Sequence, residues 1–176
     1  MTITMERRAS VELRAAGRKL EGHAALFNKP TRILDFTEVV LPGAFTATLR
    51  ENKDILALVD HERAKLLGRT RAGTLRLSED SKGLAFEIDA PDTTLAHDVR
   101  ALAERGDLGG ASFAFTVRQN GERWDGSKRE LRAVDLHEIS IITAWPAYEG
   151  TKVFARAAGP RLMLATRYLE TCKWVF

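Results

Sequence analysis

The chain is poor in the features that mark secreted and membrane proteins. It has a single cysteine, Cys172, which can form neither an internal disulfide nor a thiolate metal cluster. Its most apolar runs, residues 55–59 and 139–142, fall far short of the roughly 20 residues that span a bilayer. No apolar stretch of signal-peptide length follows the N-terminal arginines. These absences exclude a transmembrane protein, and we expect synthesis in the cytoplasm.

The chain also lacks the basic stripe of a nucleic-acid-binding domain. Its net charge is +3, from 27 Lys and Arg against 24 Asp and Glu. Residues 151–176 hold five basic residues against Glu170 alone, so this segment carries +4 and the rest of the chain −1. Because a nucleic-acid-binding domain carries its basic residues in the folded part, we expect neither nucleic acid nor a membrane as a partner.

The length and composition predict one packed core. With 176 residues, 44% of them hydrophobic, the chain is too short for two ordinary domains. We expect an N-terminal tail over residues 1–9, one domain over residues 10–157, and a basic C-terminal helix or tail over residues 158–176.

Short strands dominate the expected structure. Alternating or wholly apolar stretches bounded by turn residues predict strands over residues 10–14, 19–27, 55–59, 74–77, 84–89, 109–117 and 131–143. Residues 119–129 are polar and contain two glycines, which predicts a loop.

Three helices are expected among these strands. One covers residues 41–50, with Pro42 near its first turn, and another covers residues 161–170. The clearest runs from Asp92, as N-cap, to Gly106, as the left-handed residue at its end. Many strands with few helices predict a mainly β (α+β) fold, either a strongly bent sheet or a β-barrel surrounded by helices.

Three residues are candidates for chemistry. Ser112 follows two glycines and an alanine, so no bulky neighbour before it blocks its hydroxyl. His61 comes directly after an apolar strand, at the rim of the expected core. Glu138 lies in a largely apolar strand, where a carboxylate needs a partner or a function. Each also has a purely structural explanation: a serine on a wet strand face, a structural histidine, or a glutamate paired with an arginine.

Together these residue types could form a Ser-His-acid triad, in which the carboxylate orients the imidazole. Asp60, Asp135 and His137 compete with Glu138 for the third place, and the sequence does not separate them. Metal binding is disfavoured because no two histidines stand at ligand spacing. Residues 106–110 lack the lysine and the following helix of a phosphate-binding loop. We therefore expect no metal and no cofactor.

Three segments, in this order, resemble the prohead (capsid maturation) proteases of tailed bacteriophages, serine peptidases related in fold to the herpesvirus assemblins. They are residues 58–61 with 67–70, residues 110–115, and residues 136–143 with 146–148. Supporting likeness at residues 22–27, 41–45 and 80–84 extends the resemblance over residues 10–157. One departure is Ala114, where the family often has glycine.

The resemblance implies a role for each candidate. Ser112 would be the nucleophile, His61 the general base and then acid, and Glu138 the group that orients and stabilises the imidazolium. It implies an endopeptidase that cleaves the scaffold portion of the major capsid protein, and itself, inside the assembling procapsid in the host cytoplasm. A homodimer would follow from the likeness to assemblins.

Two other functions are compatible with the same residues. The chain could be a non-catalytic β-barrel binding module in which Ser112 and His61 line a cleft. It could also be a capsid-assembly factor with a relic site. The basic segment from residue 151 onward is then either a solvated helix or a targeting or self-cleaved segment.

Overall fold

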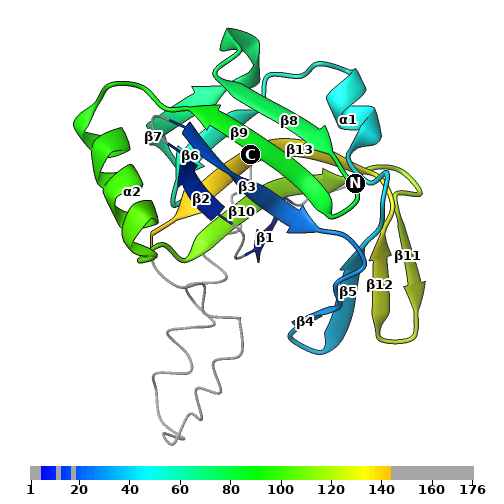
Figure 1. Cartoon of the computed structure of the whole chain (residues 1–176). Helices are drawn as coiled ribbons and strands as arrows, with labels where there is room; N and C mark the ends of the chain where they lie inside the picture. The colour runs from blue at the N-terminus through cyan, green and yellow to red at the C-terminus, as the bar shows by residue number, and fades with distance from the viewer. Residues whose placement is uncertain (1–4, 11–12, 17–18, 144–176) are drawn as a thin grey trace, which may run out of the picture.

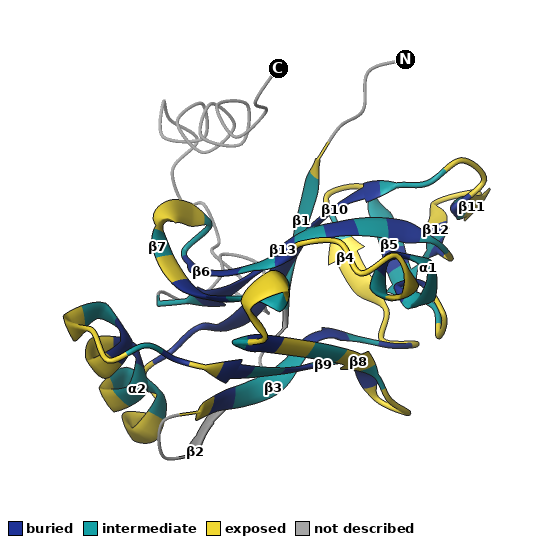
Figure 2. Ribbon diagram, turned by 90° about the horizontal axis from the view of Figure 1, so that it is seen from above, coloured by how far each residue is buried: buried dark blue, intermediate teal, exposed yellow. Residues whose placement is uncertain are grey.

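The strands of the chain form three sheets (Figure 1). The computed structural model describes residues 5–10, 13–16 and 19–143. Within these residues two sheets are stacked face to face, and the third projects from one end of the stack (Figures 1 and 2). The predicted mainly β class is confirmed. Within the described residues the sheets do not close into a barrel, so the barrel form of the prediction is not observed.

The five-stranded sheet carries the candidate residues. Its strands, in spatial order, are β1 (Glu6–Ser10), β10 (Gly110–Val117), β13 (Val134–Ile142), β6 (Leu56–Val59) and β7 (Glu62–Arg69). Strands β13 and β6 are parallel, and the other neighbours are antiparallel. Because β1 begins at Glu6, the folded part of the chain starts before residue 10, where the domain was expected to begin. The expected boundary at residue 157 lies outside the described residues.

The second sheet is antiparallel throughout. Its strands, in spatial order, are β2 (Leu13–Ala16), β3 (Lys19–Leu26), β9 (Gly83–Asp89) and β8 (Leu75–Glu79), all antiparallel. The predicted strands over residues 19–27, 74–77 and 84–89 are confirmed.

The third sheet corrects the sequence analysis. Its strands are β11 (Glu122–Asp125), β12 (Lys128–Leu131), β5 (Phe36–Val40) and β4 (Thr31–Ile33). Residues 119–129 were expected to form a loop, yet most of them form the β11–β12 hairpin. The polar sequence gave no sign of these strands, because β11 is largely exposed. Strand β12 pairs in parallel with β5, which is distant in the sequence. Phe36 and Trp124 pack edge to face across this sheet, with ring centroids 5.0 Å apart.

Two α-helices and a short 3₁₀ helix, η1 (Thr70–Ala72), complete the fold. Helix α2 (Thr94–Arg105) lies at one end of the stack and α1 (Thr46–Arg50) at the other (Figure 1). Helix α2 ends at Gly106, in the left-handed conformation with φ of 76°, as predicted. Its N-cap is Thr93, whose side chain accepts a hydrogen bond from the backbone N–H of Ala96, and not the expected Asp92.

Helix α1 is shorter than expected, because the turn at Gly43, with φ of 90°, delays its start. The predicted third helix, over residues 161–170, lies outside the described residues. No helix in the described part of the chain is long and apolar enough to cross a membrane.

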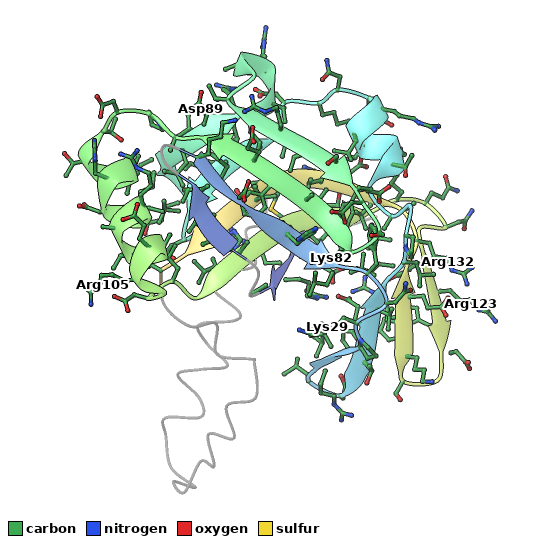
Figure 3. The ribbon with its side chains drawn as sticks, viewed as in Figure 1. Lys29, Lys82, Asp89, Arg105, Arg123 and Arg132 are labelled. Carbon is green, nitrogen blue, oxygen red and sulfur yellow. The ribbon has the colours of Figure 1, made fainter. Side chains whose placement is uncertain are left out.

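The core lies between the two stacked sheets, where buried residues face one another (Figure 2). Phe113 packs against both Phe45 and Phe115, with centroids 5.5 and 5.1 Å away. The charged side chains labelled in Figure 3 lie at the periphery and are exposed: Lys29, Lys82, Asp89, Arg105, Arg123 and Arg132. Buried charges are therefore exceptions that need a local explanation, and Glu138 is one of them.

Candidate active site

Ser112 lies on β10, in the interior of the five-stranded sheet. The side chains of Ala111, Phe113 and Phe115 belong to the core, and Ser112 alternates with them onto the opposite face. Gly110, two residues before Ser112, has φ of 112°, a conformation that glycine adopts at little cost. The serine is only 3% exposed, so its hydroxyl needs a partner within the protein.

Glu138 reaches the same face because of a β-bulge in β13. Ala114 pairs with Glu138, but the next residue, Phe115, pairs with Leu136, which leaves His137 as the extra residue. Strict alternation would place residues 136 and 138 on one face. The bulge breaks that rule, so that Leu136 belongs to the core while Glu138 lies beside Ala114 on the other face. A carboxylate in an apolar strand is thereby directed away from the core.

His61 is carried by the tight turn between β6 and β7. Val59 and Glu62 are paired, so Asp60 and His61 form the two-residue connection. Both have positive φ, 50° and 62°, as a type I′ hairpin turn requires at its two central positions. The residues after His61 form strand β7, which was not among the predicted strands. This turn aims the imidazole at the face that carries Ser112 and Glu138.

The three predicted residues meet through the two ring nitrogens of His61. Its Nδ1 lies 2.5 Å from Oε1 of Glu138, and its Nε2 lies 2.9 Å from Oγ of Ser112. The histidine and glutamate side chains are 14% and 9% exposed. The structure thus brings Ser112, His61 and Glu138 into one hydrogen-bonded row.

The partners of His61 determine where its proton sits. An ionised carboxylate can only accept hydrogen bonds, so Nδ1 carries a proton that it donates to Glu138. In the neutral ring Nε2 is then an acceptor, and the hydroxyl of Ser112 donates to it. The row therefore leaves Ser112 poised to give its proton to His61. Low exposure strengthens these interactions, because little water screens them.

Asp60 and Asp135, which competed with Glu138 as the acid of the triad, form hydrogen bonds with other residues. The carboxylate of Asp60 accepts hydrogen bonds from the backbone N–H and the hydroxyl of Thr143, at 2.9 and 2.6 Å. Asp135 accepts from Lys53 and Arg118, at 2.8 and 2.7 Å. Among the four candidates the geometry favours Glu138.

Nε2 of His137 lies 3.0 Å from the hydroxyl of Thr116. Burial lowers its pKa below the ordinary value, and the charge of nearby Asp135 only partly opposes this effect. His137 is therefore a neutral side chain beside the row and not a member of it.

Ser140 is a site residue that the sequence analysis missed. It is fully buried, and its hydroxyl oxygen accepts a hydrogen bond of 3.1 Å from the backbone N–H of His61. A signal was available, since Ser140 stands two residues after Glu138 and therefore shares its predicted strand face. Its place in an apolar strand concealed it.

The described residues offer no group of three or more His, Cys, Asp or Glu side chains that could hold a metal ion. One groove has a volume of about 330 Å³ and is lined by apolar, basic and acidic side chains, among them Leu56, Arg63 and His137. Because Leu56 pairs directly with Glu138 across β6 and β13, this groove adjoins the row.

Comparison with known proteins identifies the family. No curated protein and no solved structure matches the chain, so the expected likeness in fold to the assemblins stays a prediction. A family model described as caudovirus prohead serine protease matches residues 4–163. That match covers nearly the whole chain, including all three residues of the row. The chain therefore belongs to the caudovirus prohead serine proteases, a family of serine peptidases that act in capsid maturation.

Proposed function

We propose that the chain is a serine endopeptidase whose catalytic residues are Ser112, His61 and Glu138. The observation that carries this proposal is the placement of His61 between the other two, with one ring nitrogen on the Ser112 hydroxyl and the other on the Glu138 carboxylate. This is the arrangement that activates a serine hydroxyl. Membership of a serine protease family supports the same chemistry.

In the first half of the reaction, Oγ of Ser112 attacks the carbonyl carbon of the scissile peptide bond while its proton moves to Nε2 of His61. The imidazolium that forms is stabilised by the Glu138 carboxylate through Nδ1. His61 then gives the proton to the departing amine nitrogen, and the C–N bond breaks. The acyl group stays on Ser112 as an ester. General base catalysis of this kind contributes typically about 10²- to 10⁴-fold in rate.

In the second half, water replaces the amine. His61 takes a proton from the water as its oxygen attacks the ester carbonyl, and then returns that proton to Oγ of Ser112. The acid product leaves and the resting state is restored. No cofactor is needed for either half, because every proton passes through His61.

We infer that the substrate is the scaffold portion of the major capsid protein, and that the protease also cleaves itself. The reaction would take place inside the procapsid in the host cytoplasm, where enzyme and substrate are concentrated together. Membership of a prohead protease family supports this location and partner. A homodimer is part of the same proposal by analogy with assemblins. In this scheme the segment from residue 151 onward, with its charge of +4, is a candidate for targeting or self-cleavage.

The test is to express the full chain together with the phage's major capsid protein and to follow intact masses over time. Ser112→Ala should reduce cleavage of both proteins on the order of 10⁵- to 10⁶-fold. Ser78→Ala is the matched control, because Ser78 is exposed on β8, far from the row in sequence and in the fold. Cleavage that survives Ser112→Ala would overturn the proposal. Cleavage of the capsid protein with no self-cleavage would remove only that part of it.

The alternative functions predict different results. A binding or assembly module with a relic site would associate with procapsids without processing the capsid protein, and Ser112→Ala would change nothing. Deletion of residues 151–176 followed by normal packaging and cleavage would end the targeting hypothesis for this segment.

A further inference from the structure

The turn that carries His61 has an unusual backbone. Asp60 and His61 are adjacent, both have positive φ, and neither is glycine. Type I′ turns favour Asn-Gly, Asp-Gly or Gly-Gly because a side chain at positive φ costs conformational free energy. A turn of this kind persists only where the surrounding structure holds it in place.

The end of β13 and Thr143, which directly follows it, supply that restraint. The backbone N–H of Asp60 donates to the carbonyl of Ile141 at 2.9 Å, and the Asp60 carboxylate accepts from Thr143 at 2.9 and 2.6 Å. One residue on, the N–H of His61 donates to Oγ of Ser140 at 3.1 Å. Four hydrogen bonds thus join the turn to residues 140–143.

The same part of β13 also pairs with the part of β10 that carries Ser112. Ser140 lies directly opposite Ser112 in the β10–β13 pair, and Ala114 pairs with Glu138 two residues along. Strand β13 therefore supplies the carboxylate that contacts the His61 ring and the hydroxyl that holds the His61 backbone. Displacement of the turn relative to β13 would lengthen the contact between Nε2 and Ser112.

We propose that Asp60 and Ser140 are positioning residues that hold the strained turn so that His61 stays within reach of Ser112. This inference rests on the proposed function. Neither side chain contacts the reacting atoms in this role, and both act through the position of the imidazole. A displacement of about 1 Å in such an arrangement can lower the rate about 100-fold.

The experiment separates two effects at residue 60: the loss of its hydrogen bonds to Thr143, and the relief of its strained backbone conformation. Asp60→Gly gives the turn the residue that its φ favours but removes both bonds to Thr143. Asp60→Asn keeps an acceptor for the Thr143 N–H and tolerates the left-handed conformation. Asn52→Gly is the matched control, because Asn52 also has positive φ, 49°, after helix α1 and away from the row.

The probe is a fluorophosphonate reagent, which forms a covalent bond to an activated serine and needs no capsid substrate. Its labelling rate reports the alignment of His61 with Ser112. We expect Asp60→Gly to lower this rate 10- to 100-fold, Ser140→Ala to lower it about 10-fold, and Asp60→Asn and Asn52→Gly to stay near the parent. In peptide cleavage the loss should fall on kcat and leave KM unchanged, since substrate contacts are untouched.

The outcomes distinguish the two proposals. Parental labelling that depends on Ser112, with Asp60→Gly and Ser140→Ala both reacting at the parental rate, would overturn the positioning roles and leave the proposed function intact. Absence of Ser112-dependent labelling in the parent would overturn both. Folding of each variant is checked by circular dichroism. If Asp60→Gly does not fold, the rate of Ser140→Ala decides the inference.

Discussion

Ser112 and Ser140 lie directly opposite each other on β10 and β13, and both engage the same histidine. Ser112 contacts the His61 ring, whereas Ser140 accepts a hydrogen bond from the His61 backbone. A single cross-strand pair therefore sets the distance between Ser112 and the turn that carries His61. The bulge at His137, three residues before Ser140 on β13, adds Glu138 to the same face. The candidate site is built chiefly by the pairing of these two strands.

Replacement of Glu138 tests the choice of acid. Glu138→Gln keeps the size of the side chain but lets its amide donate to Nδ1, which favours the wrong tautomer of His61. We expect kcat for peptide cleavage to fall about 10³- to 10⁴-fold, as when the acid of such a triad is lost. The measurement is steady-state cleavage of a capsid-derived peptide.

Asp135→Asn is the control for this prediction. Asp135 was a competitor for the same role, but it is bound to Lys53 and Arg118. Its replacement should leave kcat within a few-fold of the parent. Equal losses in the two variants, or a larger loss for Asp135→Asn, would mean that the acid has been misassigned.

A buried ionic cluster joins the five-stranded sheet to the third sheet. Glu38 on β5 is 3% exposed and accepts hydrogen bonds from Arg8 on β1, at 2.6 and 2.8 Å, and from Arg129 on β12, at 3.0 Å. Burial opposes the charge of Arg129, yet contacts with Glu6, Glu122 and Glu38 raise the pKa of this guanidinium above its ordinary value. Removal of one buried partner leaves the others with uncompensated charge.

We therefore expect Glu38→Ala to lower the free energy of unfolding by about 3–5 kcal/mol, measured by urea denaturation. Glu130→Ala removes a more exposed carboxylate of the same sheet, which pairs with Arg132. It should cost less than about 1 kcal/mol. Similar effects for the two variants would show that the cluster contributes no more than a surface pair.

Gly83 marks a close approach of β3 and β9. A Cβ at this position would collide with the backbone carbonyl of Ala25, which cannot move without breaking the strand pairing. We expect Gly83→Ala to destabilise the protein by about 1–3 kcal/mol or more in thermal unfolding. Ser81→Ala, in the exposed turn beside it, should stay within about 0.5 kcal/mol of the parent. A neutral Gly83→Ala would contradict this packing of the two strands.

The β8–β9 turn predicts a pH effect on stability. Hydrogen bonds from His23 and from the backbone N–H groups of Gly83 and Lys82 lower the pKa of Asp80 from 3.8 to about 2. Since this carboxyl binds a proton less readily when folded, its contribution is present above pH 3.8 and is lost as pH falls toward about 2.

Melting temperatures of the parent and of Asp80→Asn should therefore differ most above pH 3.8 and converge as pH approaches 2. Loss of this ionised group from the folded state is the physical reason for the convergence. A difference that stays constant across this range would show that the carboxylate's charge is not the stabilising feature.

Local sequence patterns predicted much of the fold. The pattern in residues 109–117 predicted strand β10, and Gly106 marked the end of α2. The third sheet escaped prediction because β4, β11 and β12 are short and polar, and β12 depends on a partner about 90 residues away in sequence. Strand β7 was missed for a related reason, since its exposed charges resemble those of a loop.

The sequence by itself determined which chemical groups are available: one accessible-looking serine after glycines, one histidine at the end of an apolar strand, and an acid within another strand. It could not choose among Asp60, Asp135, His137 and Glu138, because Asp60 is adjacent to His61 and the other three lie within four residues of one another. Only the tertiary structure places Glu138 beside His61, through a bulge that turns Glu138 away from the core and a two-residue turn that aims His61. Both features depend on strand pairs formed between distant residues, and local sequence does not encode their register.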